Sequence, residues 1–352
     1  MVSRSEAPAP RRPTLVDVAR RAGVSKGAAS LAMNGRPGVS ETTRQRVLAV
    51  ARELGWTANS AARALSVSRS DVIGLVLARP ARLLWLEPFY MAFISGIEAV
   101  LAETEISLLL KMVEDPDPEA EIAVYRKWWI GRKVDGVILT DVRLHDRRLA
   151  VLPELGLPAV ILGSDPDFDG AATISTVWAD NDAMIGTAVR YLAGLGHRRL
   201  ARVAGPAGLS HCISRTASFL AIAEQLGLPA PQVVSANFSG EDGARATRQL
   251  LLGPDRPTAI MYENDVMAVA AVGAARELGI EVPADVSILA WDDSPLCGLI
   301  HPTVTAMQRD VPAMGRQVAR LLLDVIDGSE RTARLETPGV LVPRGSTAPP
   351  SG

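Results

Sequence analysis

The chain has 352 residues, of which 48% are hydrophobic and 22% charged, and its formal net charge is −2. Such a length predicts two or three domains with a sizeable core, and the composition is typical of a folded globular protein. No apolar run approaches the roughly 20 residues of a membrane-spanning helix, so we expect no membrane partner. Residues 1–12 carry charges and prolines without a signal peptide's apolar core, which predicts a disordered tail on a cytoplasmic protein.

Two cysteines, Cys212 and Cys297, are too few for a disulfide framework, and we expect free thiols. The four histidines are scattered without metal-ligand spacing. We therefore expect no metal and no cofactor.

The small net charge hides an asymmetry between the two ends of the chain. Residues 1–70 contain 12 Lys and Arg against 4 Asp and Glu, a charge of +8, so the remainder carries −10. A basic head on an acidic body favours a head that binds a polyanion.

Two short helices are predicted at the start of the head. Thr14, with Asp17 three residues later, resembles a capping box, and Gly23 ends the first helix in a tight turn. Ser25 then caps a second helix that runs to about Met33. Two short helices joined by a turn of three or four residues with a glycine form a helix-turn-helix, whose second helix enters the DNA major groove. The alternative is an ordinary helical hairpin.

Gly27 occupies the first turn of the second helix, although glycine costs about 0.5–1 kcal/mol there relative to alanine. A glycine at this position lets the backbone approach DNA closely. A third helix is expected from Glu41 to Leu54, capped by Ser40. The segment Asn59 to Leu65 can form two helical turns, too short to be stable without a partner.

The stretch from "TLVDVARRAG" through "NSAARAL" resembles the DNA-binding headpiece and hinge of the lactose-repressor (LacI/GalR) family of bacterial transcription regulators. The resemblance implies that residues 59–65 form a hinge helix, whose Leu65 opens a base step from the minor groove. It gives a set of expected DNA contacts: Thr14, Ser25, Lys26, Gly27, Ser30, Leu31, Asn34, Asn59, Ala62 and Leu65. Ala28, Ala29 and Leu31 depart from the family pattern. Leu31 offers no hydrogen bond to a base edge, so direct readout by this helix depends mainly on Lys26.

Beyond residue 71, short apolar runs alternate with helical patterns. The strand-like runs are 72–78, 107–112, 134–140, 158–163, 200–205, 258–265 and 287–293, and the helical stretches between and after them are 89–103, 118–131, 181–195, 214–226, 265–278 and 311–326. Repeated strand and helix predicts doubly wound parallel sheets in an α/β body. A body of this size is large for one sheet, so we expect two lobes with a ligand cleft at the strands' carboxyl ends.

The family resemblance continues through blocks such as "ADNDAMIGTAVRYLAGLGHRRLA" and "HPTVTAMQRD". It implies a periplasmic-binding-protein-like fold behind an all-α helix-turn-helix headpiece. We predict a headpiece over 13–58, a hinge and linker over 59–70, a body over 71–345 and a tail over 346–352. The predicted lobes are 72–162 with 294–325, and 163–293 with 326–345.

Candidate effector residues follow the predicted strand ends. The resemblance assigns Arg215, Asn264 and Asp292 to the effector, and together they offer donors, an amide and an acceptor suited to sugar hydroxyls. The alternatives are that Arg215 bridges the lobes and that Asn264 orders its own turn. Phe89 and Trp291 are candidate stacking faces, with a place in the core as the alternative for each.

The sequence therefore predicts a homodimeric transcriptional repressor that binds operator DNA under allosteric control by a small ligand, a sugar. The alternatives are a solute-binding protein of a sugar transporter, which leaves the basic head unexplained, and an enzyme on the α/β body. We find no nucleophile–base pair and no phosphate-binding loop, and we predict no catalytic residue.

Overall fold

The computed structural model describes residues 13–56, 69–79, 87–114 and 117–351. The chain divides into two compact units, a head within residues 1–70 and a body over residues 71–352. Each unit is described by itself.

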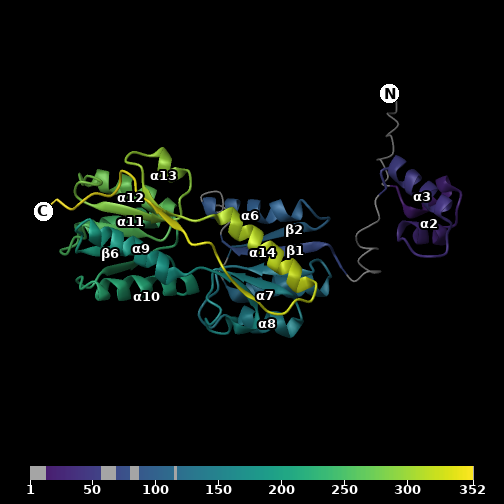
Figure 1. The fold of residues 1–352 in the computed structure, drawn as a ribbon, viewed down its shortest axis with the longest axis horizontal. Helices are drawn as coiled ribbons and strands as arrows, with labels where there is room; N and C mark the ends of the chain where they lie inside the picture. Colours follow the sequence, from purple (N-terminus) through teal and green to yellow (C-terminus); the bar gives the residue numbers. More distant parts are fainter. Residues whose placement is uncertain (1–12, 57–68, 80–86, 115–116, 352) are drawn as a thin grey trace, which may run out of the picture. The chain divides into compact units, whose positions relative to one another are not determined.

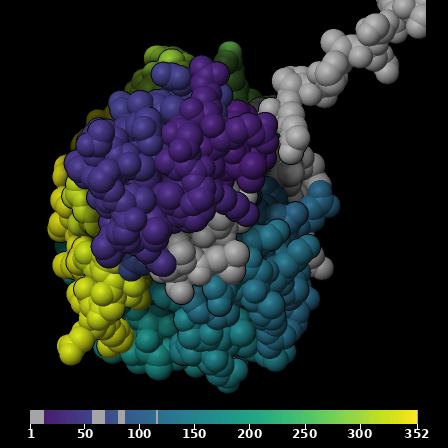
Figure 2. All heavy atoms as spheres, turned by 90° about the vertical axis from the view of Figure 1, so that its right-hand side faces the viewer, coloured from purple at the N-terminus to yellow at the C-terminus, as the bar shows by residue number. Residues whose placement is uncertain are grey.

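Over residues 13–56 the head is a bundle of three helices, α1 (Leu15–Ala22), α2 (Lys26–Met33) and α3 (Glu41–Glu53). The predicted capping box is confirmed, because the Thr14 side chain accepts from the Asp17 amide while the Asp17 carboxylate accepts from the Thr14 amide. Gly23 ends α1 at φ 65°, a left-handed conformation that glycine adopts without strain. Val18, Ala29 and Val47, one from each helix, are fully buried and form the centre of a small core. In the space-filling view the residues of the head, coloured purple to blue, form one closely packed group (Figure 2).

The body contains two six-stranded sheets (Figure 1). The first has the order β11-β5-β4-β3-β1-β2, and all its neighbouring strands are parallel. Its strands are β1 (Val72–Ala78), β2 (Ser107–Val113), β3 (Gly136–Leu139), β4 (Ala159–Leu162), β5 (Ser175–Trp178) and β11 (Ala333–Leu335).

The second sheet has the order β12-β10-β9-β8-β6-β7 and is parallel except for the pair β10 and β12. Its strands are β6 (Leu200–Ala204), β7 (Gln232–Ser235), β8 (Ala259–Tyr262), β9 (Ser287–Trp291), β10 (Thr305–Gln308) and β12 (Val340–Val342).

Helices cover both faces of each sheet, so the central strands are largely apolar. On the first sheet α6 (Pro88–Leu101) and α14 (Val311–Ile326) cover one face, and α7 (Pro118–Ile130) and α8 (Arg147–Leu155) the other. On the second sheet α11 (Gly240–Leu252) and α12 (Asp265–Glu277) share a face, opposite α9 (Asn181–Gly194) and α10 (Ser210–Gln225). The described part of the body also has two shorter helices, η1 (Ala171–Thr173) and α13 (Leu296–Leu299). The predicted fold class, a helical head on a two-lobed body of parallel sheets, is confirmed.

The lobe boundaries differ from those predicted. Strand β5 pairs with β4 of the first sheet, although residues 163–293 were assigned to the second lobe. Strand β10 pairs with β9 of the second sheet, although it was assigned to the first. The chain therefore passes between the lobes at 179–180, 309–310 and 336–339. Hydrogen bonds between distant strands decide these boundaries, and the strands concerned have only four or five residues, too short to carry a periodic signal.

The last residues of the chain lie along the second sheet. The Ser346 hydroxyl, fully buried, donates to the Ile288 carbonyl at 2.6 Å. The His197 ring contacts the Ala348 carbonyl at 2.9 Å and the Ser287 hydroxyl at 3.0 Å, which gives this histidine a structural role. The Ser351 hydroxyl also donates to the Ala284 carbonyl, so the segment predicted as a tail belongs, through residue 351, to the body.

Within the described ranges, no helix is long and apolar enough to cross a bilayer.

Candidate functional site

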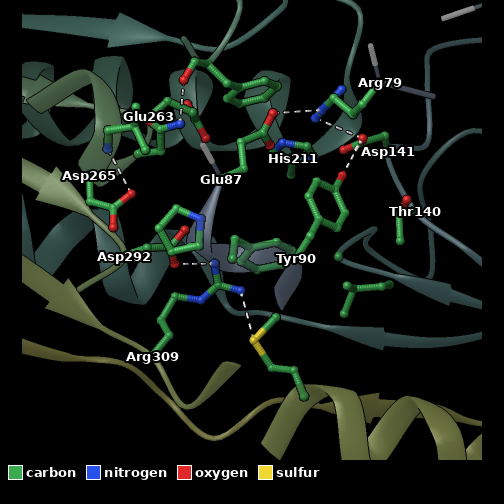
Figure 3. A pocket seen from close by; sticks show the side chains of 18 of the residues that line it. Arg79, Glu87, Tyr90, Thr140, Asp141, His211, Glu263, Asp265, Asp292 and Arg309 are labelled. Carbon is green, nitrogen blue, oxygen red and sulfur yellow. Dashed lines mark hydrogen bonds and ion pairs between the residues drawn. The ribbon is translucent and has the colours of Figure 1, made fainter. Parts of the chain in front are cut away.

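The carboxyl ends of strands from both sheets meet around a cavity of about 720 Å³, counted to its open mouth (Figure 3). The first lobe supplies residues that follow β1 and β3, and the second lobe residues that follow β8 and β9. Open parallel sheets bind ligands at this position because the loops after their strands diverge there.

Four of the five predicted effector residues line this cavity: Phe89, Arg215, Asn264 and Asp292. The fifth, Trp291, does not line the cavity, so this prediction is wrong. Its side chain is fully buried in the core of the second lobe and lies beneath the Arg215 guanidinium, 4.4 Å from the ring centroid. Trp291 therefore supports Arg215 from below and is not part of the cavity's lining.

Arg215 lies in the second turn of α10, which begins four residues before the predicted helix. Its Nη1 donates to Glu263 Oε1 at 2.6 Å and its Nε to Asn181 Oδ1 at 3.1 Å. No hydrogen bond among the described residues engages Nη2, which leaves this group for a ligand. Both partners belong to the second lobe, so these contacts do not make Arg215 a bridge between lobes.

Asn264 caps α12, because its Oδ1 accepts from the Met267 amide at 2.8 Å while its Nδ2 donates to the Phe238 carbonyl at 2.9 Å. Asn264 therefore orders its own turn, which is the alternative role considered for it. The neighbouring Asp265 also lines the cavity and accepts from the Ser294 amide at 3.2 Å. Burial raises the pKa of Asp265 to about 6.

Asp292 turns the chain after β9 at φ 66°, a conformation that aspartate tolerates better than most residues. Its Oδ1 accepts from Arg309 Nη1 at 3.1 Å, and Arg309 Nη2 contacts Glu336 Oε2 at 3.2 Å. Arg309 and Glu336 belong to two of the segments that pass between the lobes. The ion pairs of Asp292 therefore join the cavity wall to the hinge of the body.

On the first lobe, Arg79 follows β1 and contacts Asp141 at 3.0 Å and Glu87 at 3.4 Å. Tyr90 donates to the same Asp141 oxygen at 2.8 Å. Burial works against the charge of Asp141, but the facing Arg79 holds the pKa of this carboxyl below its usual value. The Arg79 guanidinium also lies 4.9 Å from the ring centroid of Phe238, which belongs to the second lobe.

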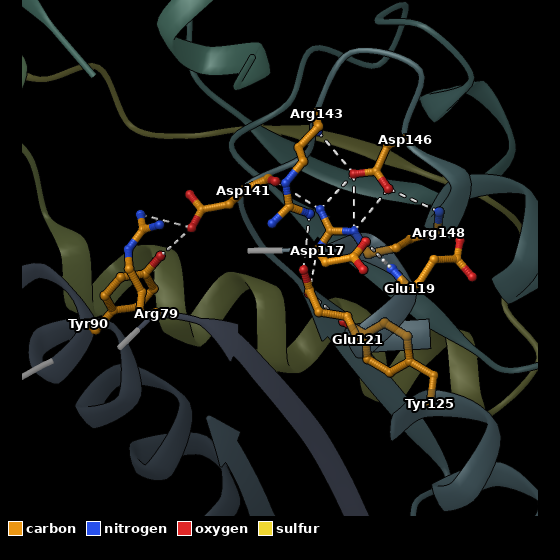
Figure 4. A network of polar contacts seen from close by, with 10 residues as sticks. All are labelled: Arg79, Tyr90, Asp117, Glu119, Glu121, Tyr125, Asp141, Arg143, Asp146 and Arg148. Carbon is orange, nitrogen blue, oxygen red and sulfur yellow. Dashed lines mark hydrogen bonds and ion pairs between the residues drawn. The ribbon is translucent and has the colours of Figure 1, made fainter. Parts of the chain in front are cut away.

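A buried network holds the loop after Asp141 (Figure 4). Arg148, 1% exposed, donates to both Asp146 and Glu121, at 2.6 Å and 2.5 Å, and to the Asp141 carbonyl at 2.8 Å. Arg143 shares Glu121 at 3.0 Å. These charged hydrogen bonds fix the path of the backbone that leaves the cavity.

The same loop contacts the second lobe through its backbone. The Leu144 amide donates to the Gly208 carbonyl at 3.0 Å, and the Ser210 amide donates to the Val142 carbonyl at 2.8 Å. Asp141 and His211, which line the cavity, are the residues adjacent to this bridge. The bridge therefore links the two lobes at the edge of the cavity.

His211, Cys212 and Glu263 place possible metal-ligand atoms within 4.8 Å of one another. Both carboxylate oxygens of Glu263 already accept from arginines, Arg215 and Arg202. Two guanidinium groups beside the cluster would repel a metal cation, so these residues do not fit a metal centre.

Sequence reasoning missed Arg79, Asp141, Glu263, Asp265 and Arg309 as lining residues. Three of them, Arg79, Glu263 and Arg309, directly follow a strand in the structure, whereas Asp141 lies two residues and Asp265 three residues after one. The position just after a strand was the signal that could have identified these residues. Their ion pairs could not be predicted, because the partner residues lie on or after other strands.

The head presents the first turn of α2 to solvent. Ser25 accepts from the Ala28 amide at 3.1 Å, and Ser25, Lys26 and Gly27 are exposed. Asn34 at the other end of α2 donates to the Ser30 carbonyl at 2.9 Å. Leu31, half-buried, packs toward Gly38, where an added Cβ would lie 3.1 Å from its Cδ1. Three predicted DNA contacts, Asn59, Ala62 and Leu65, lie outside the described residues.

Neither the backbone conformation nor the packing of the head requires a glycine at position 27. Its φ is not in the left-handed region, and an added Cβ would meet only Ser25 Oγ, at 3.8 Å. The head could accommodate alanine here at a gain in helix stability. Nothing in the described part of the head therefore requires a glycine at this position.

Comparison with known proteins covers both units. Residues 14–59 match the family model of bacterial regulatory proteins of the lacI family, and residues 189–347 match a periplasmic binding protein-like domain. The transcriptional regulator CelR of Thermobifida fusca is 32% identical over 320 residues, which cover 90% of this chain and 93% of CelR. The regulator MalR of Streptomyces coelicolor is 31% identical, with 96% and 97% covered.

Solved structures agree with these sequence matches. A lac repressor dimer bound to operator and an anti-inducer has a TM-score of 0.83 at 26% identity, with 96% of this chain and 100% of that chain covered. A complex of CelR with cellobiose has a TM-score of 0.73 at 30% identity, with 95% and 100% covered. A helix-turn-helix head, a two-lobed body and relatives matched along nearly their whole length make this chain a member of the lacI family of bacterial transcriptional regulators.

Proposed function

We propose that this regulator binds operator DNA in the cytoplasm as a homodimer and that a small polyhydroxyl ligand between its lobes controls this binding. The observation that carries the proposal is the presence, in one chain, of an exposed, basic helix-turn-helix and a cavity, lined by both charged and apolar residues, between two hinged lobes. The alternative of a transporter's solute-binding protein explains the cavity alone. None of the relatives compared is named as an enzyme or as a transporter component.

DNA binding is assigned to the first turn of α2. Lys26 is the exposed cation at its start, and we assign it the base-edge contact, while Thr14, Ser25, Ser30 and Asn34 contact phosphates or bases beside it. Gly27 lets the backbone approach the groove, which accounts for a glycine that the head itself does not need. Leu31 offers only an apolar contact, suited to a thymine methyl group.

The ligand is assigned to the cavity. Arg215 Nη2 offers a donor, Asp292 an acceptor and Phe89 an apolar ring, a combination suited to sugar hydroxyls. Cellobiose is the first probe to test, because the relative CelR has been solved with it. Since segments 309–310 and 336–339 join the lobes next to the cavity, a ligand that contacts both lobes would bias the angle between them.

The test begins with selection of binding sites from random duplexes, followed by titration of the selected operator at several salt concentrations. We expect a near-palindromic site and an affinity that falls steeply with salt, because a basic head releases counterions from DNA. Lys26→Ala should lose about 1–3 kcal/mol and relax sequence choice at one position in each half-site. An affinity that hardly changes with salt would refute DNA binding by the head.

The ligand arm uses a thermal-shift screen of sugars, cellobiose included, followed by operator titration with each hit. Arg215→Lys preserves the charge beside Glu263 but removes the free guanidinium donor. We expect this variant to keep ligand-free operator binding and to lose most of the ligand response. An unchanged response would remove Arg215 from the ligand site.

A further inference from the structure

A second arginine lies behind the cavity wall. Arg202, in the middle of β6, is fully buried, and its Nη2 donates to Glu263 Oε2. The other oxygen of Glu263 accepts from Arg215 at 2.6 Å. One carboxylate thus lies between a core arginine and the arginine that faces the ligand.

Glu263 remains charged in this arrangement. Burial alone would raise the pKa of Glu263, but the attraction of Arg202 and Arg215 holds it below the usual value. The carboxylate is fully buried and also accepts a long bond from the Gly205 amide, at 3.4 Å. A fixed negative charge therefore stands directly behind Arg215.

The remaining lining follows the same pattern. Three arginines and five carboxylic acids line the cavity among the described residues, a formal excess of two negative charges when all ionise. Arg79 is paired with Glu87 and Asp141, Arg309 with Asp292 and Glu336, and Arg215 with Glu263. Behind the wall, Arg202 and Glu336 offset each other. A phosphate or carboxylate that bound the free Arg215 Nη2 would meet a guanidinium whose charge Glu263 already balances, and it would lie among the other carboxylates of the lining.

We propose, building on the ligand site proposed above, that Glu263 sets the charge of the ligand that this cavity accepts. The cavity takes an uncharged polyhydroxyl molecule, and it excludes molecules that carry a phosphate or carboxylate group. Arg215 serves this ligand as a hydrogen-bond donor whose charge is already shared with Glu263. Arg202 is a positioning residue, because it holds the second oxygen of Glu263 away from the cavity.

The test asks whether removal of Glu263 creates an anion site. Thermal unfolding of the full chain is followed with inorganic phosphate as the probe, against sodium chloride at equal ionic strength. We expect no phosphate-specific shift of the body in the wild type. In Glu263→Gln, Arg215 loses its counter-charge, and phosphate at ten times its dissociation constant should raise the melting temperature by about 3 °C.

Two further variants make the result decisive. Arg202→Leu combined with Glu263→Ala removes the buried pair together, so it folds without an unpaired charge in the core and should show the same phosphate shift. Glu277→Gln removes an exposed acid that is also paired with an arginine, Arg248, and should behave as the wild type. Phosphate bound by the basic head affects all four proteins equally, so the difference between them isolates the cavity.

A wild-type shift as large as that of Glu263→Gln would overturn the proposal, and so would the absence of a shift in both Glu263 variants. A ligand from the sugar screen that is ionised at neutral pH would overturn it as well. The phosphate assay needs neither operator nor natural ligand. Its failure is therefore distinct from failure of the proposed DNA-binding function.

Discussion

The head and the body prepare their functional side chains in opposite ways. In the head, Ser25, Lys26 and Gly27 are exposed at a helix start, and no ion pair among the described residues engages Lys26. In the cavity of the body, Arg79, Arg215 and Arg309 are each bound to carboxylates. The polyanion that the head is proposed to bind supplies the missing counter-charges itself, whereas the body's own carboxylates already pair with the arginines of its cavity.

The two units therefore also differ in how much their charged residues contribute to stability. The head's core consists of small side chains around three short helices, and its surface charges cost little to change. The body buries whole ionic networks, in which the loss of one partner leaves the others uncompensated. We therefore expect substitutions of charged residues to have large effects in the body and small ones in the head.

The largest effect is expected from Arg148→Met. This change leaves Asp146 and Glu121 buried beside an apolar chain and should lower the body's free energy of unfolding by about 3–5 kcal/mol. Chemical denaturation measures the loss, and hydrogen exchange should show unchanged protection in the head's helices. The neighbouring Arg147, whose pair with Glu119 is exposed, is the control, and Arg147→Ala should cost at most about 1 kcal/mol. Equal losses would contradict the contrast between buried and exposed pairs.

A smaller effect, on the order of 2 kcal/mol, is expected from Asp265→Asn and depends on pH. The folded-state pKa of Asp265 is raised to about 6, so the unfolded chain ionises first and wild-type stability falls as pH rises from about 4 through 6. The variant lacks this loss and should exceed the wild type more at pH 7 than at pH 4. Melting curves across this range test it, with the exposed Asp255→Asn as control. A pH-independent difference between variant and wild type would refute it.

Ser210→Pro should cost about 1 kcal/mol and act on the lobes specifically. Proline removes the amide that donates to the Val142 carbonyl, yet it suits the first residue of α10, and Leu209 already has the extended backbone required before proline. Ser210→Ala keeps the amide and is the matched control. Spin labels at the exposed Ile130 and Leu252 should report a broader distribution of distances between the lobes in the proline variant only. Identical distributions would mean that this bridge does not restrain the lobes.

The smallest change in stability is expected from Gly27→Ala, which should stabilise the head by about 0.5–1 kcal/mol and yet weaken operator binding. The added methyl group fits the head but occupies the space through which DNA approaches. Gly273→Ala, at an equally open position on α12, should stabilise the body without any effect on DNA. Operator titrations of both variants test this prediction. Unchanged binding by Gly27→Ala would remove the proposed reason for this glycine.

The sequence predicted the head's three helices almost to the residue because their signals are local. Thr14, Ser25 and Ser40 each cap the helix that they precede, and each cap is visible within four residues of sequence. The central strands of the body were also predictable, since they are buried on both faces and read as apolar runs.

The cavity was only partly predictable, for a physical reason. Arg202 looks like an interruption in an apolar strand until β6 pairs with β8 and Glu263 reaches it from 61 residues away. Similarly, nothing local in β5 or β10 tells which sheet it joins. Pairing over long distances in sequence determines both, and periodicity does not report it.

The C-terminal segment has a practical consequence. Residues 341–346 read "LVPRGS", a sequence that thrombin cleaves after the arginine and that is widely used to remove purification tags. Here Arg344 is paired with Asp293 at 2.7 Å, and Ser346 is fully buried, so the segment is not free to enter a protease as an extended chain. Cleavage requires this part of the second lobe to open first, which makes the rate of thrombin digestion a built-in measure of local unfolding.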